Sequence, residues 1–341
     1  MNFDRLFSNN CYVIAEAGLN HNGSIEIAKK LIDLAAEAGA NAVKFQKRTV
    51  EQLATKSTLD KIDNRFPDFG KTYRQIREHL EFNNEQYLLL KKYSEDLNLD
   101  FIVTAFDNAA VDFLEKINIK IYKLASHSLT NYPLLEYISK KNKPVILSTG
   151  MCNLDEIDQS VEIFKRNKTP LALMHCVSSY PTPLDECNLS MMEVLSKRYN
   201  LPVGYSGHEL GYLPTLTSVS LGANLVERHY TLDKEMIGFD HKMSLDPNEL
   251  ISMIRDIRSI YKIVGNGKKE ISETEWITRK KYHVSMVSSK KILKNSILDE
   301  SMVVYRNPGT GISYKKSKMV LGKKAKKDID ANVLLSQDMF I

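Results

Sequence analysis

The sequence predicts a (β/α)₈ barrel of the TIM type, about 250 residues long, followed by a small β-rich domain. Three observations predict it. Short apolar runs alternate with helical patterns along the first two thirds of the chain, the runs number eight, and nearly every run ends in a polar residue able to do chemistry. A chain of 341 residues with 43% hydrophobic and 26% charged residues can bury the large core that such a barrel needs.

The eight apolar runs are expected to be the barrel strands. In chain order they are CYVIAEAG (11–18), NAVKFQ (41–46), DFIVTAF (100–106), IKIYKLAS (119–126), PVILSTG (144–150), PLALMHC (170–176), PVGYSGH (202–208) and ANLVERH (223–229). Strands buried on both faces with helical crossovers make a parallel sheet, and eight such units predict closure into a barrel. An open doubly wound sheet is the alternative. No GxGxxG follows any run, which counts against a dinucleotide-binding fold.

The amphipathic stretches between the runs are expected to be the outer helices. In residues 24–39 the apolar positions recur at helical spacing until a glycine provides a stop. We place the barrel at residues 1–267 and predict a charged helical linker over 268–282, with a capping box that begins at Ser272. Short β-like runs then predict a β-rich domain over 283–341.

The basic charge belongs to the C-terminal segment. Residues 280–341 hold thirteen Lys and Arg against five Asp and Glu, a balance of +8, so with +5 for the whole chain the preceding residues carry −3. Basic tails often bind nucleic acid, but this one has ladders of Val, Ile and Leu and neither an aromatic series nor zinc-finger spacing. We therefore expect no nucleic-acid partner and interpret the segment as a basic folded cap over an anionic substrate.

Hydropathy and cysteine usage predict a soluble cytoplasmic protein. No run of 18 or more apolar residues is present, and residues 1–10 lack a signal-peptide pattern, so we expect no membrane association. The four cysteines are too scattered for a disulfide framework and lack the CxxC spacing of a thiolate zinc site. They are Cys11, Cys152, Cys176 and Cys187.

The active site of a barrel lies at the carboxyl ends of its strands, and here those ends carry functional groups. The residues in these positions are Glu16, Lys44, Gln46, Thr104, Lys123, Ser126, Ser148, His175, Ser206, His208 and His229. One such residue would be chance, and one or two Ser or Thr are expected to cap helices or close loops. Eight strands that end in this way predict an active site.

The lysines and histidines of this set predict the binding of an anionic ligand and a metal. Lys44 and Lys123 come from separate strands and, with the neighbouring hydroxyl groups and the backbone near Gly150, suit a phosphate and a carboxylate. His208 and His229 end the seventh and eighth strands and can bind a divalent metal through neutral imidazoles. Water and substrate oxygens would fill the other ligand positions, which makes an open catalytic site.

The stretch HYTLDKEMIGFDHKMSL, residues 229–245, gathers further candidate groups. It places His229, Asp233, Asp240 and His241 within thirteen positions. By itself this stretch is compatible with a metal site, an acid/base pair or a polar loop.

Eight motifs in order along the chain resemble the sialic acid synthase family. They are AEAGLNHNG (15–23), AVKFQ (42–46), KLAS (123–126), LSTGM (147–151), HCVSSYPTP (175–183), GYSGHELG (204–211), ERHYTLDKEMIGFDHKMSL (227–245) and RNPGTGI (306–312). Synthases of this family condense phosphoenolpyruvate with an N-acylated hexosamine, such as N-acetylmannosamine or a diamino-dideoxyhexose. The product is a nine-carbon 2-keto-3-deoxy acid, and phosphate leaves by C–O cleavage.

The resemblance implies roles for the strand-end residues. Phosphoenolpyruvate would be held by Lys44, Lys123, Ser126 and Ser148, with Thr104 and Ser206 alongside. A divalent metal, usually manganese, with magnesium or cobalt as alternatives, would sit on His208 and His229. Glu16 is the candidate that steers or deprotonates the attacking water, and Asp240 corresponds to an acid near the metal or the sugar. Asp233 and His241 have either a structural or a functional role.

Around the sugar, the chain departs from the family pattern. Ser128 stands where the family carries a glutamate, and Ser178 stands where it carries an asparagine. Both positions lie near the sugar in the family's site. We also expect Gln46, Ser178 and Tyr180 to bind substrate. These departures leave open N-acetylneuraminate, legionaminate and pseudaminate as the product type.

The resemblance also implies that the C-terminal domain is an antifreeze-like (SAF) domain. In the family this domain reaches over the barrel of a partner subunit, so a domain-swapped homodimer is expected, with Arg306 in contact with the sugar. The motif reads Arg306-Asn307-Pro308-Gly309, in which the arginine is one residue further from the proline than in the family.

A type I aldolase is the alternative enzyme class. In such an enzyme Lys123 would form a Schiff base with a keto acid. Borohydride trapping separates the two chemistries, because a lysine adduct would exclude the phosphoenolpyruvate condensation.

Overall fold

The computed structural model describes residues 11–341, so residues 1–10, on which the prediction of no signal peptide rests, lie outside the described residues. The chain divides into two compact units, Met1–Gly265 and Asn266–Ile341. Across residues 11–341, none of the helices has the length and hydropathy that crossing a membrane requires.

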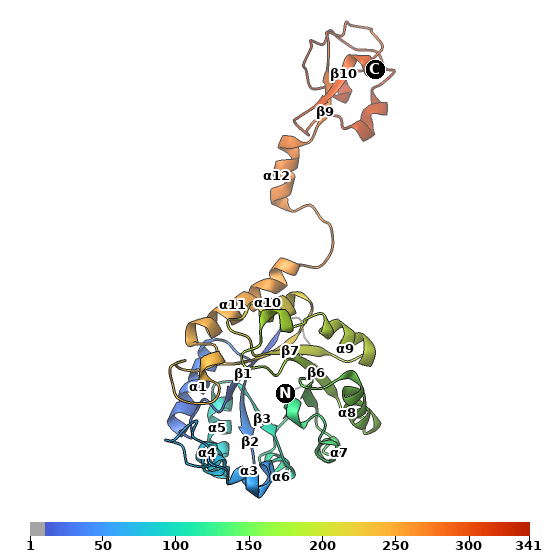
Figure 1. The fold of residues 1–341 in the computed structure, drawn as a ribbon. Coiled ribbons are helices and arrows are strands. Elements are labelled where there is room, and N and C mark those ends of the chain that lie inside the picture. Colours follow the sequence, from blue (N-terminus) through green and yellow to red (C-terminus); the bar gives the residue numbers. More distant parts are fainter. Residues whose placement is uncertain (1–10) are drawn as a thin grey trace. The chain divides into compact units, whose positions relative to one another are not determined.

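The first unit is a closed barrel of eight parallel strands in chain order (Figure 1). The strands are β1 (Tyr12–Gly18), β2 (Ala42–Lys47), β3 (Asp100–Ala105), β4 (Tyr122–Leu124), β5 (Val145–Ser148), β6 (Leu171–Cys176), β7 (Val203–Gly207) and β8 (Leu225–His229). All eight predicted strands are present. The predicted (β/α)₈ barrel is confirmed, and the open sheet is excluded because β1 pairs with both β2 and β8.

Helices form the connections and surround the barrel (Figure 1). They are α1 (Ile25–Glu37), α2 (Val50–Leu53), α3 (Lys56–Leu59), α4 (Tyr73–Leu80), α5 (Asn84–Asp96), α6 (Asn108–Lys116), α7 (Tyr132–Ser139), α8 (Leu154–Arg166), α9 (Met191–Tyr199), α10 (Leu213–Ser220) and α11 (Pro247–Val264). The helix predicted within 24–39 is α1, and the side chain of Ser24 caps its first turn. The β2–β3 connection holds four helices, α2 to α5, and is the longest excursion from the barrel.

The barrel interior has an apolar floor beneath a polar layer. The floor is a buried apolar cluster on or next to the strands: Tyr12, Ile14, Ala42, Ile102, Ile121, Ile146, Ala172, Met174 and Leu225. Side chains alternate along a strand, so the residue two positions further on faces the same interior. Those next residues are Glu16, Lys44, Thr104, Lys123, Ser148, Cys176 and Glu227, all buried. The same alternation turns the residues between them toward the helices.

A buried ion pair holds the ends of β7 and β8 from the outer side. Arg228 Nη1 contacts the carboxylate of Glu209 and donates to Thr215 Oγ1 at 2.8 Å. Arg228 Nη2 donates to the backbone carbonyls of Glu209 at 2.7 Å and Gly211 at 2.8 Å. Both charged side chains are almost fully buried, with exposed fractions of 1% and 0%. The pair therefore fixes the loop that follows His208.

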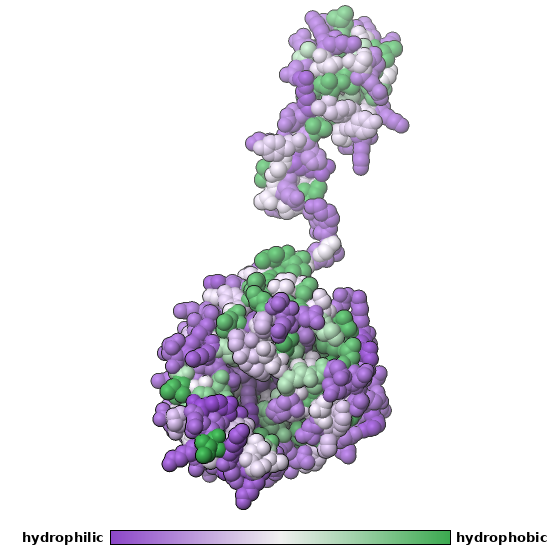
Figure 2. Space-filling view, viewed as in Figure 1, coloured by the Kyte–Doolittle hydropathy of each residue, from purple (hydrophilic) through white to green (hydrophobic). Residues whose placement is uncertain are grey.

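The second unit has its own small core. It contains α12 (Glu273–Tyr282) and an antiparallel pair of strands, β9 (Ser285–Ser288) and β10 (Val303–Arg306). The capping box predicted at the start of α12, between Ser272 and its partner Glu275, is present. A separate apolar cluster lies beside the sheet: Met286, Ile292, Leu298, Ile312, Val320, Ala325, Ile329, Leu335 and Phe340. Hydrophilic residues predominate on the visible surface of both units (Figure 2).

Candidate active site

A polar cavity of about 90 Å³ lies at the carboxyl ends of the barrel strands. The predicted residues that line it are Glu16, Lys44, Gln46, Thr104, Lys123, Ser126, Ser148, Ser178, Tyr180, Ser206, His208 and His229. These residues come from all eight strands and the loops that follow them. The barrel thus brings together side chains that are up to about two hundred positions apart in sequence.

Two buried lysines dominate the cavity. Lys44 Nζ lies 2.9 Å from Glu16 Oε2, 3.5 Å from Glu227 Oε1 and 3.0 Å from Thr104 Oγ1. Lys123 Nζ lies 3.3 Å from the same oxygen of Glu227. Glu227 therefore connects ammonium groups from β2 and β4 across the barrel axis.

The surroundings of the two lysines affect their protonation differently. Burial alone would lower the pKa of Lys44, but Glu16 and Glu227 outweigh it and raise that pKa above its ordinary value. For Lys123, burial and then the nearby charge of Lys44 prevail over Glu227, and the pKa is lowered. Lys123 also donates to Ser148 Oγ at 2.9 Å. Both side chains are positioned by partners before any ligand binds.

Glu227 lines the cavity, although the sequence analysis did not name it as a candidate. Burial disfavours its charged form, yet Lys123 and Lys44 outweigh burial and bring its pKa to about 2. Ser206 Oγ lies 3.4 Å from the same carboxylate. A signal was present in the sequence, because Glu227 lies two positions before His229 and strand alternation puts both on one face.

Near the ends of β5 and β6, the backbone at Gly150 lies close to two serine hydroxyl groups that line the cavity. The backbone N–H of Gly150 donates to Ser126 Oγ at 3.0 Å. A Cβ at Gly150 would lie 2.4 Å from Ser178 Oγ and 2.9 Å from Ser126 Oγ, so any side chain here would displace both hydroxyl groups. Hydroxyl and backbone N–H groups at this spacing suit the oxygens of a phosphate or a carboxylate.

His208 and His229 face one another at the cavity wall, with ring centroids 5.6 Å apart. Burial lowers the pKa of His229, which favours the neutral imidazole that a metal requires. The buried Nδ1 of His229 has no hydrogen-bond partner within residues 11–341. Nδ1 of His208 lies 3.0 Å from the Val177 carbonyl oxygen, which orients the ring.

This donor set fits a divalent metal with an open coordination sphere. No cluster of three or more His, Cys, Asp or Glu ligands occurs in the described part of the chain, so the two imidazoles would be supplemented by water or substrate oxygens. The pKa of His208 is raised, because Cys176 and the Val177 carbonyl outweigh burial, so a metal would compete with a proton there. Gly18, at φ +54°, leaves room for the ring, since a Cβ would lie 3.0 Å from His229 Cε1.

The three candidates in the loop after β8 have different contacts. Asp240 Oδ2 lies 3.9 Å from His229 Nδ1, which places its carboxylate beside the histidine pair. His241 is buried and lies 2.7 Å from Thr231 Oγ1 through Nδ1, and 3.2 Å from Asn22 Oδ1 through Nε2. Asp233 accepts the N–H of Glu235 at 2.9 Å and shapes a local turn. The contacts of Asp233 and His241 are therefore those of loop residues.

Of the other substrate-site candidates, Gln46 and Tyr180 line the cavity. Gln46 Nε2 donates to Glu16 Oε1 at 2.6 Å. The ring of Tyr180 is 55% exposed and packs 4.3 Å from the ring of His208. Ser128 is buried, and its hydroxyl has no hydrogen-bond partner among the residues described. Arg306 lies on β10 of the second unit, where it donates to Asn332 Oδ1 at 2.7 Å, and its contact with a sugar stays a prediction.

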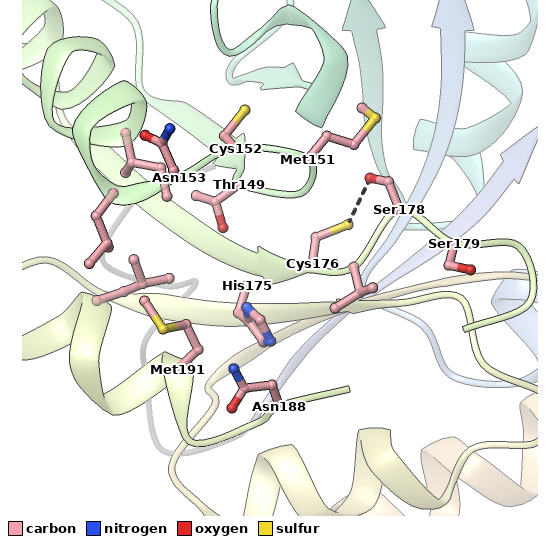
Figure 3. A pocket seen from close by; sticks show the side chains of 14 residues that line it. Thr149, Met151, Cys152, Asn153, His175, Cys176, Ser178, Ser179, Asn188 and Met191 are labelled. Carbon is pink, nitrogen blue, oxygen red and sulfur yellow. Dashed lines mark hydrogen bonds between the residues drawn. The ribbon is translucent and has the colours of Figure 1, made fainter. Parts of the chain in front are cut away.

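His175 was wrongly included among the strand-end functional groups. It projects from β6 on the side opposite to Cys176, toward Asn188 (Figure 3). Its Nε2 lies 2.8 Å from the Cys187 carbonyl oxygen. The residues that face the barrel axis on this strand are the even-numbered ones, so His175 points outward into a neighbouring cavity of about 490 Å³. Alternation, rather than position at the strand end, decides access to the site.

The sequence profile of the NeuB family matches residues 31–269. The N,N'-diacetyllegionaminic acid synthase of Campylobacter jejuni is 38% identical over 95% of this chain and 98% of that protein. The N-acetylneuraminate-9-phosphate synthase of Homo sapiens is 35% identical over 87% of this chain and 83% of that protein. The N-acetylneuraminic acid (sialic acid) synthetase of Leptospira borgpetersenii, solved with citrate, superimposes with a TM-score of 0.69 at 37% identity over 79% of this chain and 90% of that one. The barrel, its polar layer and these likenesses together show that the chain belongs to the NeuB family.

Proposed function

We propose that this chain condenses phosphoenolpyruvate with an N-acylated hexosamine to a nine-carbon 2-keto-3-deoxy acid of the sialic acid type, with release of phosphate. The observation that carries the proposal is the meeting of Lys44 and Lys123 at Glu227 beneath a ring of hydroxyl groups. Two ammonium groups that converge from different strands can hold a small dianion or trianion in a fixed place. The named relatives are synthases of this type.

The side chains of the cavity divide the work of the reaction. Lys44 and Lys123 hold the anionic groups of phosphoenolpyruvate, so that its C3 is directed at the acceptor's aldehyde carbon. As the C–C bond forms, C2 gains positive character, and the carboxylates of Glu16 and Glu227 lie beside it in a buried setting. Glu16 accepts a proton from the water that attacks C2. The former aldehyde oxygen takes up a proton, and phosphate leaves by cleavage of the C2–O bond while the hydroxyl group on C2 loses its proton to become the keto group.

His208 and His229 would hold a divalent metal, with manganese as our first choice and magnesium or cobalt as alternatives. When bound, such a metal supplies Lewis-acid polarisation of the acceptor's carbonyl group. Asp240, beside His229, orients the acceptor or a water molecule at this wall. Gln46 and Tyr180 contact the acceptor from the rim, and Ser128 and Ser178 help to select it.

Phosphate release tests the proposal. The full chain, supplied with manganese and phosphoenolpyruvate, is expected to release phosphate only when an N-acylated hexosamine or a diamino-dideoxyhexose is added. Mass spectrometry should show one nine-carbon keto acid for each phosphate released. Buried Lys123, with its lowered pKa, also has the property that a Schiff-base lysine needs, so borohydride is the necessary second arm. A lysine adduct trapped with a keto acid, without phosphate release, would replace the condensation by type I aldolase chemistry.

We also propose that the second unit is an antifreeze-like (SAF) domain and that it completes a partner's site in a cytoplasmic homodimer. The basic balance of +8 over residues 280–341 suits a cap over an anionic substrate. Arg306 is exposed at the end of β10, so its side chain is accessible to another surface. The four cysteines are unpaired, as a reducing compartment favours.

Subunit mixing tests the shared site. On its own, the Arg306→Ala variant is expected to bind the sugar more weakly, with a smaller effect on the binding of phosphoenolpyruvate. The His208→Ala variant on its own is expected to be inactive. Mixed and allowed to exchange subunits, they should recover activity, because one site of each heterodimer has both histidines and an intact Arg306 from its partner. A mixture that stays inactive after verified exchange, or an active monomer, would mean that Arg306 acts within its own chain or has no role.

A further inference from the structure

The loop after β1 has no role in the proposed mechanism, although it belongs to the first of the eight sequence motifs. It reads LNHNG over residues 19–23 and directly follows the strand that carries Glu16. Asn20 in this loop is buried, with an exposed fraction of 1%, and its side chain binds a segment more than two hundred positions further along the chain. A buried amide has to be satisfied by protein groups, so these contacts show what Asn20 holds.

The side-chain nitrogen of Asn20 donates two hydrogen bonds. It donates to the backbone carbonyl oxygen of Tyr230 at 2.8 Å and to Ser244 Oγ at 2.8 Å. The carbonyl oxygen of Tyr230 can only accept, so the amide group must turn its nitrogen toward it. Asn20 therefore connects the residue directly after His229 with a residue at the other end of the β8 loop.

The hydroxyl group of Ser244 extends this connection to Asp240. Its Oγ accepts from Asn20 and donates to the backbone carbonyl oxygen of Asp240 at 2.6 Å. A hydroxyl group has one proton, so these two partners fix its direction. Ser244 is buried, with an exposed fraction of 1%. The connection from Asn20 through Ser244 thus ends at the residue whose Oδ2 lies 3.9 Å from Nδ1 of His229.

Backbone contacts join His229 to the same connection. The N–H of Leu245 donates to the carbonyl oxygen of His229 at 2.9 Å, and Tyr230 pairs with Leu245 in a parallel bridge. Leu245 directly follows Ser244, as Tyr230 directly follows His229. Both contacts of Asn20 therefore lie next to the backbone that carries His229.

Asn22 joins the same two loops through other residues. Its Nδ2 donates to the carbonyl oxygen of Ile237 at 2.8 Å, and its Oδ1 lies 3.2 Å from Nε2 of His241. Neither partner is a residue that the metal or the acceptor is proposed to contact. Asn22 is therefore a matched control, because it links the loops without holding His229 or Asp240.

We infer that Asn20 and Ser244 are positioning residues of the proposed metal site, which together hold the carboxylate of Asp240 beside His229. This inference rests on the metal site of the proposed function and deepens it. A carboxylate on a loop stays beside an imidazole only when the loop backbone is fixed, because a free backbone gains conformational entropy. A carboxylate held there strengthens the binding of a divalent cation by charge attraction and by accepting hydrogen bonds from its water ligands.

Manganese binding to the metal-depleted full chain tests the inference without turnover. Calorimetric titration gives the Kd of manganese for the wild type and for three alanine variants. Asn20→Ala and Ser244→Ala should each raise this Kd by about 10- to 100-fold, the range for loss of an outer partner of a metal ligand. The control Asn22→Ala should change it by less than about 3-fold, because it leaves those outer partners in place. Thermal unfolding verifies that the variants are folded, and Ser244→Ala, which removes one oxygen atom, keeps the test decisive should Asn20→Ala not fold.

A double-mutant cycle separates positioning from general support of the loop. Ser244 binds the backbone carbonyl group of Asp240, which stays in place when Asp240→Ala removes the carboxylate. If Ser244 acts by placing that carboxylate, Ser244→Ala should change the manganese Kd of the Asp240→Ala variant by less than about 2-fold. A residue that only supports the loop would give the same fold-change in both backgrounds.

Four results would overturn the inference. The first is a manganese Kd that neither Asn20→Ala nor Ser244→Ala changes. The second is an equal loss in the Asn22→Ala variant, which would reflect the joining of the two loops in general. The third is additivity of Ser244→Ala and Asp240→Ala, and the fourth is a wild-type chain that binds no manganese.

Turnover separates failure of the inference from failure of the proposed function. In the phosphate-release assay, Ser244→Ala should raise the manganese concentration for half-maximal activity by about 10- to 100-fold. At saturating manganese its loss of kcat should not exceed that of Asp240→Ala. No phosphate release with any acceptor would overturn the proposed function, and the manganese titration would still decide the role of Asn20 and Ser244.

Discussion

Replacement of His208 or of His229 by alanine is expected to abolish the condensation while the barrel stays folded. Both rings lie above the packed apolar floor, so their loss removes the proposed metal ligands without opening a cavity in the core. Exhaustive chelation of the wild-type enzyme should have the same effect, and added manganese should restore activity. The measurements are phosphate release, metal content by mass spectrometry and the unfolding midpoint.

His175→Ala is the matched control for the histidine variants. This histidine lies on the neighbouring strand β6 but points away from the barrel axis. Its replacement should leave metal content unchanged and most of the activity intact. Activity that survives chelation, or equal losses at positions 175 and 208, would exclude the histidine pair as the metal site.

Replacement of Lys44 or of Lys123 by methionine is expected to lower kcat/KM for phosphoenolpyruvate by about 10- to 150-fold. Each change removes a charge-assisted contact worth about 1.5–3 kcal/mol while keeping most of the side-chain volume. It also leaves a buried carboxylate with fewer partners, so the free energy of unfolding should fall. The fall should be larger for Lys44, because Lys44 pairs with both Glu16 and Glu227 while Lys123 pairs with Glu227 alone.

Steady-state kinetics with each substrate varied in turn, together with denaturant unfolding, measures both effects. Lys290→Met is the control, since Lys290 is exposed and its Nζ donates to the hydroxyl of Ser301 at 3.3 Å. A similar change in kcat/KM for all three variants would mean that phosphoenolpyruvate binds elsewhere. An effect on the KM of the sugar alone would assign the lysines to the acceptor.

The sequence predicted the barrel because its strands are buried on both faces. Runs such as PLALMHC at 170–176 are apolar except for one histidine near the end, and helices cover them. The period-two signal of a half-buried sheet is therefore weak, and the length of the run predicts the strand. The fourth run was predicted too long. It covers 119–126, whereas β4 is Tyr122–Leu124, since Ser126–Ser128 turn into a short 3₁₀ helix.

The candidate site was predicted less completely than the fold, because reading the last residue of each strand ignores side-chain direction. His175 lies near the carboxyl end of its strand, but its side chain points away from the barrel axis. Glu227 lies two residues before the end of its strand, and its side chain points toward the axis and lines the cavity. Alternation counted back from His229 would have identified Glu227.

The ion pair between Arg228 and Glu209 affects how a loss of activity in variants of this enzyme is interpreted. Each partner is the immediate chain neighbour of a proposed metal ligand, His229 and His208, yet both face the helices. Loss of either partner would strand an uncompensated charge and cost about 3–5 kcal/mol. A scan scored by activity alone would therefore rank positions 209 and 228 with the catalytic groups. Activity measured at two temperatures would separate the two groups. A variant that is only destabilised would lose activity on warming, whereas a variant without a metal ligand would be inactive at both temperatures.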